Sequence, residues 1–120
     1  MNLFTYGTLM DPAVWMRVAL EPCARQPATL PGYEARRLRG ETFPGLVKCA
    51  GATTPGLLYE SVSAAARARL DDYEGDIYMR AEVAVTLENG ATAPAEVYLL
   101  LPEHSGLVLP DKWLPPSVAP

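Results

Sequence analysis

Residues 78–101, YMRAEVAVTLENGATAPAEVYLLL, decide the fold class. In the first half, apolar residues at every second position alternate with polar or small residues, which is the pattern of a β-strand with one buried face. Asn89-Gly90 follows, the dipeptide that type I′ turns favour, and a second apolar arm comes after it. The sequence therefore predicts a β-hairpin with one face in a core.

More β-structure is expected upstream of this hairpin. Residues 27–60 are interrupted by Pro or Gly every few positions, and the apolar stretches between these residues are short. Twelve prolines in 120 residues disfavour a helical bundle. We expect short strands joined by tight turns in this part of the chain.

Two helices are predicted between the strands. Residues 2–6, NLFTY, have the composition of a short buried strand, and the helix that follows has Asp11 as N-cap and Pro12 at its first position. The segment VSAAARARLDDYE, residues 62–74, is the second helix, with Ser63 as N-cap and several alanines of high helix propensity.

Composition predicts one domain over residues 1–120, with an irregular, proline-rich tail over about 102–120 that Trp113 anchors. The net charge of −4 offers no attraction for nucleic acid. No apolar run approaches the roughly 20 residues that span a bilayer, and the first residues lack a basic leader. We expect a cytoplasmic protein without nucleic-acid or membrane partners.

The sequence lacks the residue patterns that are typical of metal sites and of serine nucleophiles. Cys23 and Cys49 lie far apart, outside metal-ligand spacing, and are expected to be buried free thiols. A Ser-His-Asp triad would have to use His104, Ser105 and Asp111. The sequence has no GxSxG turn to present a serine nucleophile, and these three residues lie in the proline-rich tail. The sequence therefore predicts no metal site and no such triad.

The loop YGTL, residues 6–9, lies between the predicted first strand and first helix. A glycine there lets the backbone bend sharply and leaves successive N–H groups that could hold a carboxylate or a developing oxyanion. The alternative is that this glycine only lets the chain reverse its direction and has no binding role.

The segment LDDYEGDIYMR, residues 70–80, ends the second predicted helix. Leu70, Tyr73 and Glu74 follow helical spacing and share the apolar face, so we expect Leu70 and Tyr73 to pack. The remaining acids are expected to be solvated: Asp71, Asp72 and Asp76.

Glu74 is the acid expected to face inward, at the C-terminal end of a helix. Burial and the helix dipole both disfavour its charged form there and raise its pKa. A buried carboxylate without compensation is a candidate functional group, and an ion pair with Arg80 or Arg36 is the structural alternative.

Five segments in this order together resemble the gamma-glutamylcyclotransferase-like family. They are LFTYGTLM (3–10), LPGYEARRLRG (30–40), FPGLV (43–47), PGLLYE (55–60) and LDDYEGDIYMR (70–80). The resemblance covers roughly residues 2–101. It implies an α+β fold, a small mixed β-barrel of about five to seven strands flanked by two helices.

The resemblance also implies a reaction and its catalytic group. The α-amine of a γ-glutamyl group attacks its own γ-carbonyl, which expels an amine and releases 5-oxoproline. Glu74, the glutamate of the YEG motif, would be the general acid and base. No metal or organic cofactor is required.

The remaining implied site residues would bind the substrate. The backbone N–H groups of Gly7, Thr8 and Leu9 would hold either its α-carboxylate or the tetrahedral oxyanion. The aromatic walls would be Tyr6 and Tyr78, which plain core packing explains equally well. Arg80 would position Glu74 or hold substrate.

The expected partner is a small γ-glutamyl amine or amino acid, and the expected assembly is a monomer or weak homodimer. The leaving group and the role of the tail stay open. A non-catalytic module that binds a small carboxylate in the same pocket is the second hypothesis. A protein–protein adaptor that uses edge strands and the tail is the third.

Overall fold

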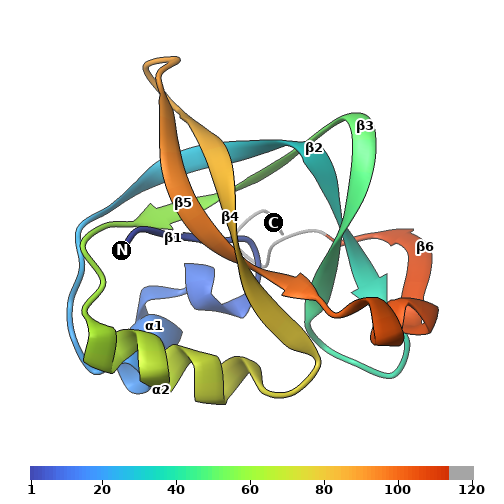
Figure 1. Cartoon of the computed structure of the whole chain (residues 1–120), viewed down its shortest axis with the longest axis horizontal. Coiled ribbons are helices and arrows are strands. Elements are labelled where there is room, and N and C mark those ends of the chain that lie inside the picture. Colours follow the sequence, from blue (N-terminus) through green and yellow to red (C-terminus); the bar gives the residue numbers. More distant parts are fainter. Residues whose placement is uncertain (114–120) are drawn as a thin grey trace.

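The computed structural model describes residues 1–113 and arranges them as a β-barrel with two helices at one end (Figure 1). In chain order the elements are β1 (Leu3–Thr5), η1 (Thr8–Met10), α1 (Pro12–Ala19), β2 (Arg25–Leu38), β3 (Pro44–Tyr59), α2 (Ala64–Glu74), β4 (Tyr78–Leu87), β5 (Thr92–Leu100), η2 (Pro102–Leu107) and β6 (Val108–Lys112).

Five strands close the barrel, in the order β3-β1-β5-β4-β2, because β2 also pairs with β3. β6 adds to the outer end of β2 as a sixth strand. All pairings are antiparallel except the one between β1 and β5. The mixed barrel flanked by two helices confirms the expected fold class.

The predicted hairpin is confirmed as β4 and β5, but its turn is longer than the two-residue type I′ turn. Leu87 N donates to Ala91 O (2.8 Å), and the Asn89 side chain accepts from Ala91 N (2.9 Å). Among the turn residues 88–90, Gly90 alone has a positive φ, of 86°. A three-residue connection ending in a left-handed glycine fits this geometry.

The short strands expected over residues 27–60 are wrong, since this region forms two long antiparallel strands, β2 and β3. The register shifts between Pro31 and Tyr33, where Gly32 has a φ of 84°. This glycine forms a bulge, which bends a strand without ending it. The Pro and Gly residues here therefore curve continuous strands around the barrel.

Both predicted helix starts are confirmed by their caps. The Asp11 side chain accepts from Ala13 N (2.9 Å), and the Ser63 hydroxyl accepts from Ala66 N (3.1 Å). The two helices pack beneath the barrel (Figure 1), around the stacked rings of Trp15 and Tyr59, whose centroids lie 3.7 Å apart. A second core of apolar side chains fills the barrel.

The tail expected to be irregular is ordered up to Trp113. Arg36 pairs with Lys112 and Leu38 with Val108, so residues 108–112 extend the sheet as β6. Trp113 N donates to Ala35 O (2.9 Å), and the side chain packs against the barrel core. The anchor prediction is thus confirmed, and residues 114–120 of the tail lie outside the described residues.

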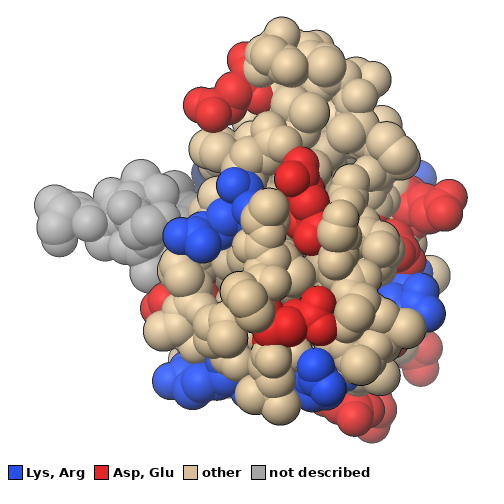
Figure 2. Space-filling view, turned by 90° about the vertical axis from the view of Figure 1, so that its left-hand side faces the viewer, with Lys and Arg blue, Asp and Glu red and all other residues tan. Residues whose placement is uncertain are grey.

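Acidic and basic side chains are interspersed on the face shown in Figure 2. Within the described chain, no helix has the length and apolar character needed to cross a membrane. Cys23 and Cys49 are free thiols, each only partly buried. Among residues 1–113, no three His, Cys, Asp or Glu side chains gather as a metal site would require.

Candidate active site

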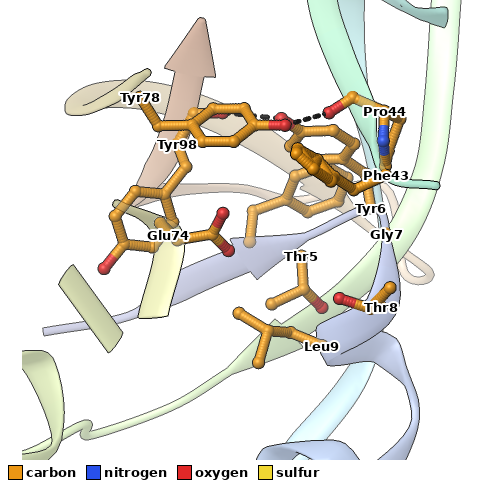
Figure 3. A pocket seen from close by; sticks show the side chains of 11 residues that line it. Thr5, Tyr6, Gly7, Thr8, Leu9, Phe43, Pro44, Glu74, Tyr78 and Tyr98 are labelled. Carbon is orange, nitrogen blue, oxygen red and sulfur yellow. Dashed lines mark hydrogen bonds between the residues drawn. The ribbon is translucent and has the colours of Figure 1, made fainter. Parts of the chain in front are cut away.

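A pocket opens between the end of β1, the end of α2 and the turn before β3 (Figure 3). The space between its atoms, together with the solvent at its open mouth, amounts to about 350 Å³. Its lining residues are Phe4, Thr5, Tyr6, Gly7, Thr8, Leu9, Phe43, Pro44, Glu74, Tyr78 and Tyr98. The pocket therefore brings the YGTL loop and Glu74 together, although more than sixty residues separate them in the sequence.

The YGTL loop leaves β1 and turns directly into η1. The first hydrogen bonds of this turn are Met10 N to Gly7 O (3.0 Å) and Asp11 N to Thr8 O (3.1 Å). The amides of Gly7, Thr8 and Leu9 precede these donors, so the hydrogen bonds of the turn leave them available. All three residues line the pocket.

The loop is supported by Tyr59, which does not line the pocket. The Tyr59 hydroxyl, which is buried, donates to Leu9 O (2.9 Å). The Tyr59 ring stacks on Trp15 of α1 with an interplanar angle of 3°. A buried hydrogen bond and an aromatic stack thus fix the backbone whose amides line the pocket.

Glu74 is the last residue of α2, and Gly75, with a φ of 77°, caps the helix. The Glu74 side chain is partly buried, and its carboxyl group projects into the pocket (Figure 3). Burial raises the pKa of Glu74 to about 7. At neutral pH the group is therefore divided between its two protonation states and can both accept and donate a proton.

Neither arginine considered as an ion-pair partner for Glu74 binds it. Arg36 Nε lies 2.9 Å from Glu34 Oε1, and the Arg80 guanidinium binds Asp71 and Glu96. Among residues 1–113, no salt bridge involves Glu74. The alternative of an ion pair between Glu74 and Arg80 or Arg36 is thus wrong.

Three tyrosines around Glu74 hold one another and the pocket wall in place. The Tyr6 hydroxyl donates to Tyr98 O (2.8 Å), and the Tyr78 hydroxyl donates to Pro44 O (Figure 3). Burial raises the pKa of each phenol well above its ordinary value. They are therefore neutral hydroxyl groups at any physiological pH.

Two predictions about the end of α2 are wrong. Tyr73 does not pack in the core: its side chain is 47% exposed, and its hydroxyl lies 3.2 Å from Thr8 Oγ1. Asp71 is not simply solvated, because it accepts hydrogen bonds from Arg80 and Tyr98. Leu70, by contrast, is fully buried as expected.

Arg80 is the predicted site residue that lies outside the pocket lining. Conversely, sequence reasoning assigned no role to Phe43, Pro44 and Tyr98, which line the pocket. The FPGLV segment was a usable signal for Phe43 and Pro44. Tyr98 offered none, because its place in the pocket depends on how β5 pairs with β1 and β4.

Comparisons with known proteins agree with this architecture. The family model for gamma-glutamyl cyclotransferase, AIG2-like proteins matches residues 3–115. Protein AIG2 C of Arabidopsis thaliana is 30% identical over 99 residues, which cover 82% of this chain. The match covers only 60% of that relative, so this chain corresponds to part of its length.

Solved structures show the same fold. A solution structure of an Arabidopsis thaliana protein has a TM-score of 0.81 and 26% identity, covering 93% of this chain and 75% of its own. The crystal structure of an AIG2-like protein from Mus musculus has a TM-score of 0.69 and 21% identity, and the match covers 99% of this chain and 90% of the mouse protein's chain. Because the family model matches residues 3–115, nearly the whole chain, the chain belongs to the gamma-glutamyl cyclotransferase, AIG2-like family.

Proposed function

We propose that the protein is a γ-glutamyl cyclotransferase, which converts a γ-glutamyl amine or γ-glutamyl amino acid into 5-oxoproline and a free amine. The observation that carries this proposal is the position of Glu74, whose carboxyl group faces the YGTL loop in one pocket and has no ion-pair partner among residues 1–113. Membership of the family supports the same class of reaction.

Glu74 would move the proton that the reaction must relocate. As a carboxylate it accepts a proton from the substrate's α-ammonium group, which frees the amine to attack the γ-carbonyl carbon. The new C–N bond forms, and the γ-carbonyl oxygen carries the negative charge of a tetrahedral intermediate. When the old C–N bond breaks, protonated Glu74 returns its proton to the leaving nitrogen, and the second proton that the attacking nitrogen loses departs with the amine as its ammonium ion. A pKa of about 7 suits both steps at neutral pH.

The pocket would supply orientation and charge stabilisation. Nucleophile and electrophile belong to one molecule, so folding the γ-glutamyl chain brings the reacting atoms together with a high effective concentration. The amides of Gly7, Thr8 and Leu9 are placed to bind a negative oxygen, either that of the α-carboxylate or the developing oxyanion. The neutral phenols of Tyr6 and Tyr78 would form the walls.

A panel of γ-glutamyl compounds tests this function. The panel should include γ-glutamyl amines, γ-glutamyl amino acids and a γ-glutamyl peptide, with 5-oxoproline followed by mass spectrometry. We expect 5-oxoproline from at least one class. Absence of product from every class would overturn the proposal, and a thermal shift with the same compounds would then indicate a module that binds small carboxylates without turnover.

A further inference from the structure

A charged cluster lies beside the pocket, where α2 meets β4 and β5. Arg80 Nε and Nη2 donate to Asp71 Oδ1 (2.7 Å) and Oδ2 (3.1 Å), and Nη1 donates to Glu96 Oε1 (2.6 Å). The Tyr98 hydroxyl also donates to Asp71 Oδ1 (2.6 Å). All three guanidinium nitrogens of Arg80 are thus engaged by carboxylates from two different elements.

This cluster is close to Glu74. Asp71 and Glu74 are three residues apart on α2, so their Cβ atoms are neighbours at about 5–6 Å. Tyr78 and Tyr98 line the pocket of Glu74 and also a second hollow, which Asp71, Gly75 and Arg80 complete. The carboxylate that holds Arg80 therefore lies one helical turn before Glu74, and Tyr78 and Tyr98 border both Arg80 and the pocket of Glu74.

The strands explain why Arg80 lies there. Tyr78 and Arg80 are two residues apart on β4, so both side chains point to the same face of the sheet. Tyr98 is the direct cross-strand partner of Arg80 on β5. The same hairpin register therefore places the pocket walls next to the arginine.

We propose that Asp71 and Glu96 hold the guanidinium group of Arg80 away from Glu74, so that Glu74 keeps a carboxyl group without a cationic partner. Asp71, Arg80 and Glu96 are then positioning residues, and this role rests on the acid and base function proposed for Glu74. The bidentate contact with Asp71 also ties the last turn of α2, which carries Glu74, to the barrel.

The charges around Glu74 are consistent with this arrangement. The ionisable groups of the pocket and of the adjoining cluster come from α2, the β2–β3 turn, β4, β5 and the end of β1. They are Arg67, Asp71, Glu41, Tyr78, Arg80, Glu96, Tyr98 and Tyr6. Burial raises the pKa of Asp71, but hydrogen bonds from Arg80 and Tyr98 outweigh it, and the pKa lies below its ordinary value. Asp71 is therefore ionised at neutral pH and keeps its hold on Arg80.

The test compares Asp71→Asn with Asp72→Asn in the protein without substrate. Both variants remove one negative charge from the same helical turn, but Asp72 is exposed and has no bond to Arg80. The pKa of Glu74 is measured by ¹³C NMR of its carboxyl carbon, assigned by comparison with Glu74→Gln. We expect Asp71→Asn to release Arg80 towards Glu74 and lower the pKa of Glu74 by roughly one unit or more, and Asp72→Asn to lower it by less than about half as much.

A second pair of variants keeps the test decisive if Asp71→Asn does not fold. Glu96→Gln removes the other carboxylate that binds Arg80. Its control is Glu82→Gln, which removes the exposed carboxylate on β4 that lies directly opposite Glu96. Glu96→Gln should lower the pKa of Glu74 more than Glu82→Gln does. Equal shifts within a pair would mean that only a negative charge was lost, and would overturn the proposal.

Kinetics separate this proposal from the proposed function. If the protein releases 5-oxoproline, the acidic limb of kcat/KM against pH should move to lower pH in Asp71→Asn and not in Asp72→Asn. Turnover without the NMR difference would overturn the role of the cluster and leave the function standing. The NMR difference without turnover would overturn the function and leave the control of Glu74 by Arg80 standing.

Discussion

The hydroxyl oxygens of Tyr73 and Thr8 lie 3.2 Å apart and join the last turn of α2 to the turn that follows β1. Tyr73 is exposed, whereas its neighbour Glu74 points into the pocket. Thr8 belongs to the YGTL loop, which forms the opposite wall. One exposed hydrogen bond thus connects the two parts of the candidate active site.

Tyr73→Phe should loosen this connection without unfolding the protein. An exposed hydrogen bond contributes about 1 kcal/mol or less, so we expect a change of that size in the free energy of unfolding. The amides of Gly7, Thr8 and Leu9 should exchange faster with deuterium, because the loop loses its tie to α2. Hydrogen exchange followed by mass spectrometry measures this effect.

Thr8→Val is the matched control, since it removes the other hydroxyl of the same bond. The double variant should exchange no faster than either single variant, because both changes remove one interaction. Unchanged exchange in Tyr73→Phe would contradict the connection.

Stability should depend on pH through Glu74. The pKa of Glu74 is about 7 in the folded protein, against an ordinary value of 4.5 that applies after unfolding. Between these values the folded chain binds a proton that the unfolded chain has lost, so stability falls as pH rises through this window and levels off above it. The contribution amounts to about 3 kcal/mol at most.

Glu74→Gln should lack this loss. Its free energy of unfolding relative to wild type should increase between about pH 4.5 and pH 8, by up to about 3 kcal/mol. Urea denaturation at both pH values measures the difference, with Asp72→Asn as the exposed control. A constant difference between wild type and Glu74→Gln would contradict a raised pKa.

Two glycines should respond differently to alanine. A Cβ on Gly56 would collide with Thr5 O and lie 2.7 Å from the Phe4 ring, so Gly56→Ala should cost about 3 kcal/mol of stability. A Cβ on Gly7 would lie 3.0 Å from Pro44 Cδ, which must shift by only a few tenths of an ångström. We expect Gly7→Ala to cost about 1 kcal/mol or less.

Gly7→Ala should lower activity although it costs little stability. Pro44 lines the pocket and its carbonyl accepts from Tyr78, so Gly7→Ala disturbs the wall and should lower kcat/KM by about tenfold. Urea denaturation and 5-oxoproline release, each measured on both variants, check this. A stable Gly56→Ala, or full activity in Gly7→Ala, would contradict the packing described.

Local patterns predicted the hairpin and the helix starts, because these depend on neighbouring residues such as Asn89-Gly90, Asp11 and Ser63. They could not predict that Gly32 bends a long strand instead of ending it, since that outcome depends on pairing along β3. The pairing of Lys112 with Arg36 is likewise set by contacts between segments far apart in the chain.

In the candidate site, too, local patterns predicted some features and could not predict others. Helical spacing was enough to place Glu74 on the side of Leu70. The bonds of Asp71 were not predictable, because its partners Arg80 and Tyr98 reach it only when α2 packs against the paired strands β4 and β5. Tyr73 is exposed, and its hydroxyl contacts the Thr8 hydroxyl of the YGTL loop.

The most direct measurement of the central claim is the rate of 5-oxoproline release by wild type and Glu74→Gln on the best substrate of the panel. Glutamine keeps the shape of the side chain but can neither accept nor return the proton. Removing the general acid and base should lower kcat by about 10²–10⁴-fold, while Asp72→Asn, which changes an exposed carboxylate two residues away, stays within about twofold of wild type. A Glu74→Gln variant as fast as wild type would contradict the claim.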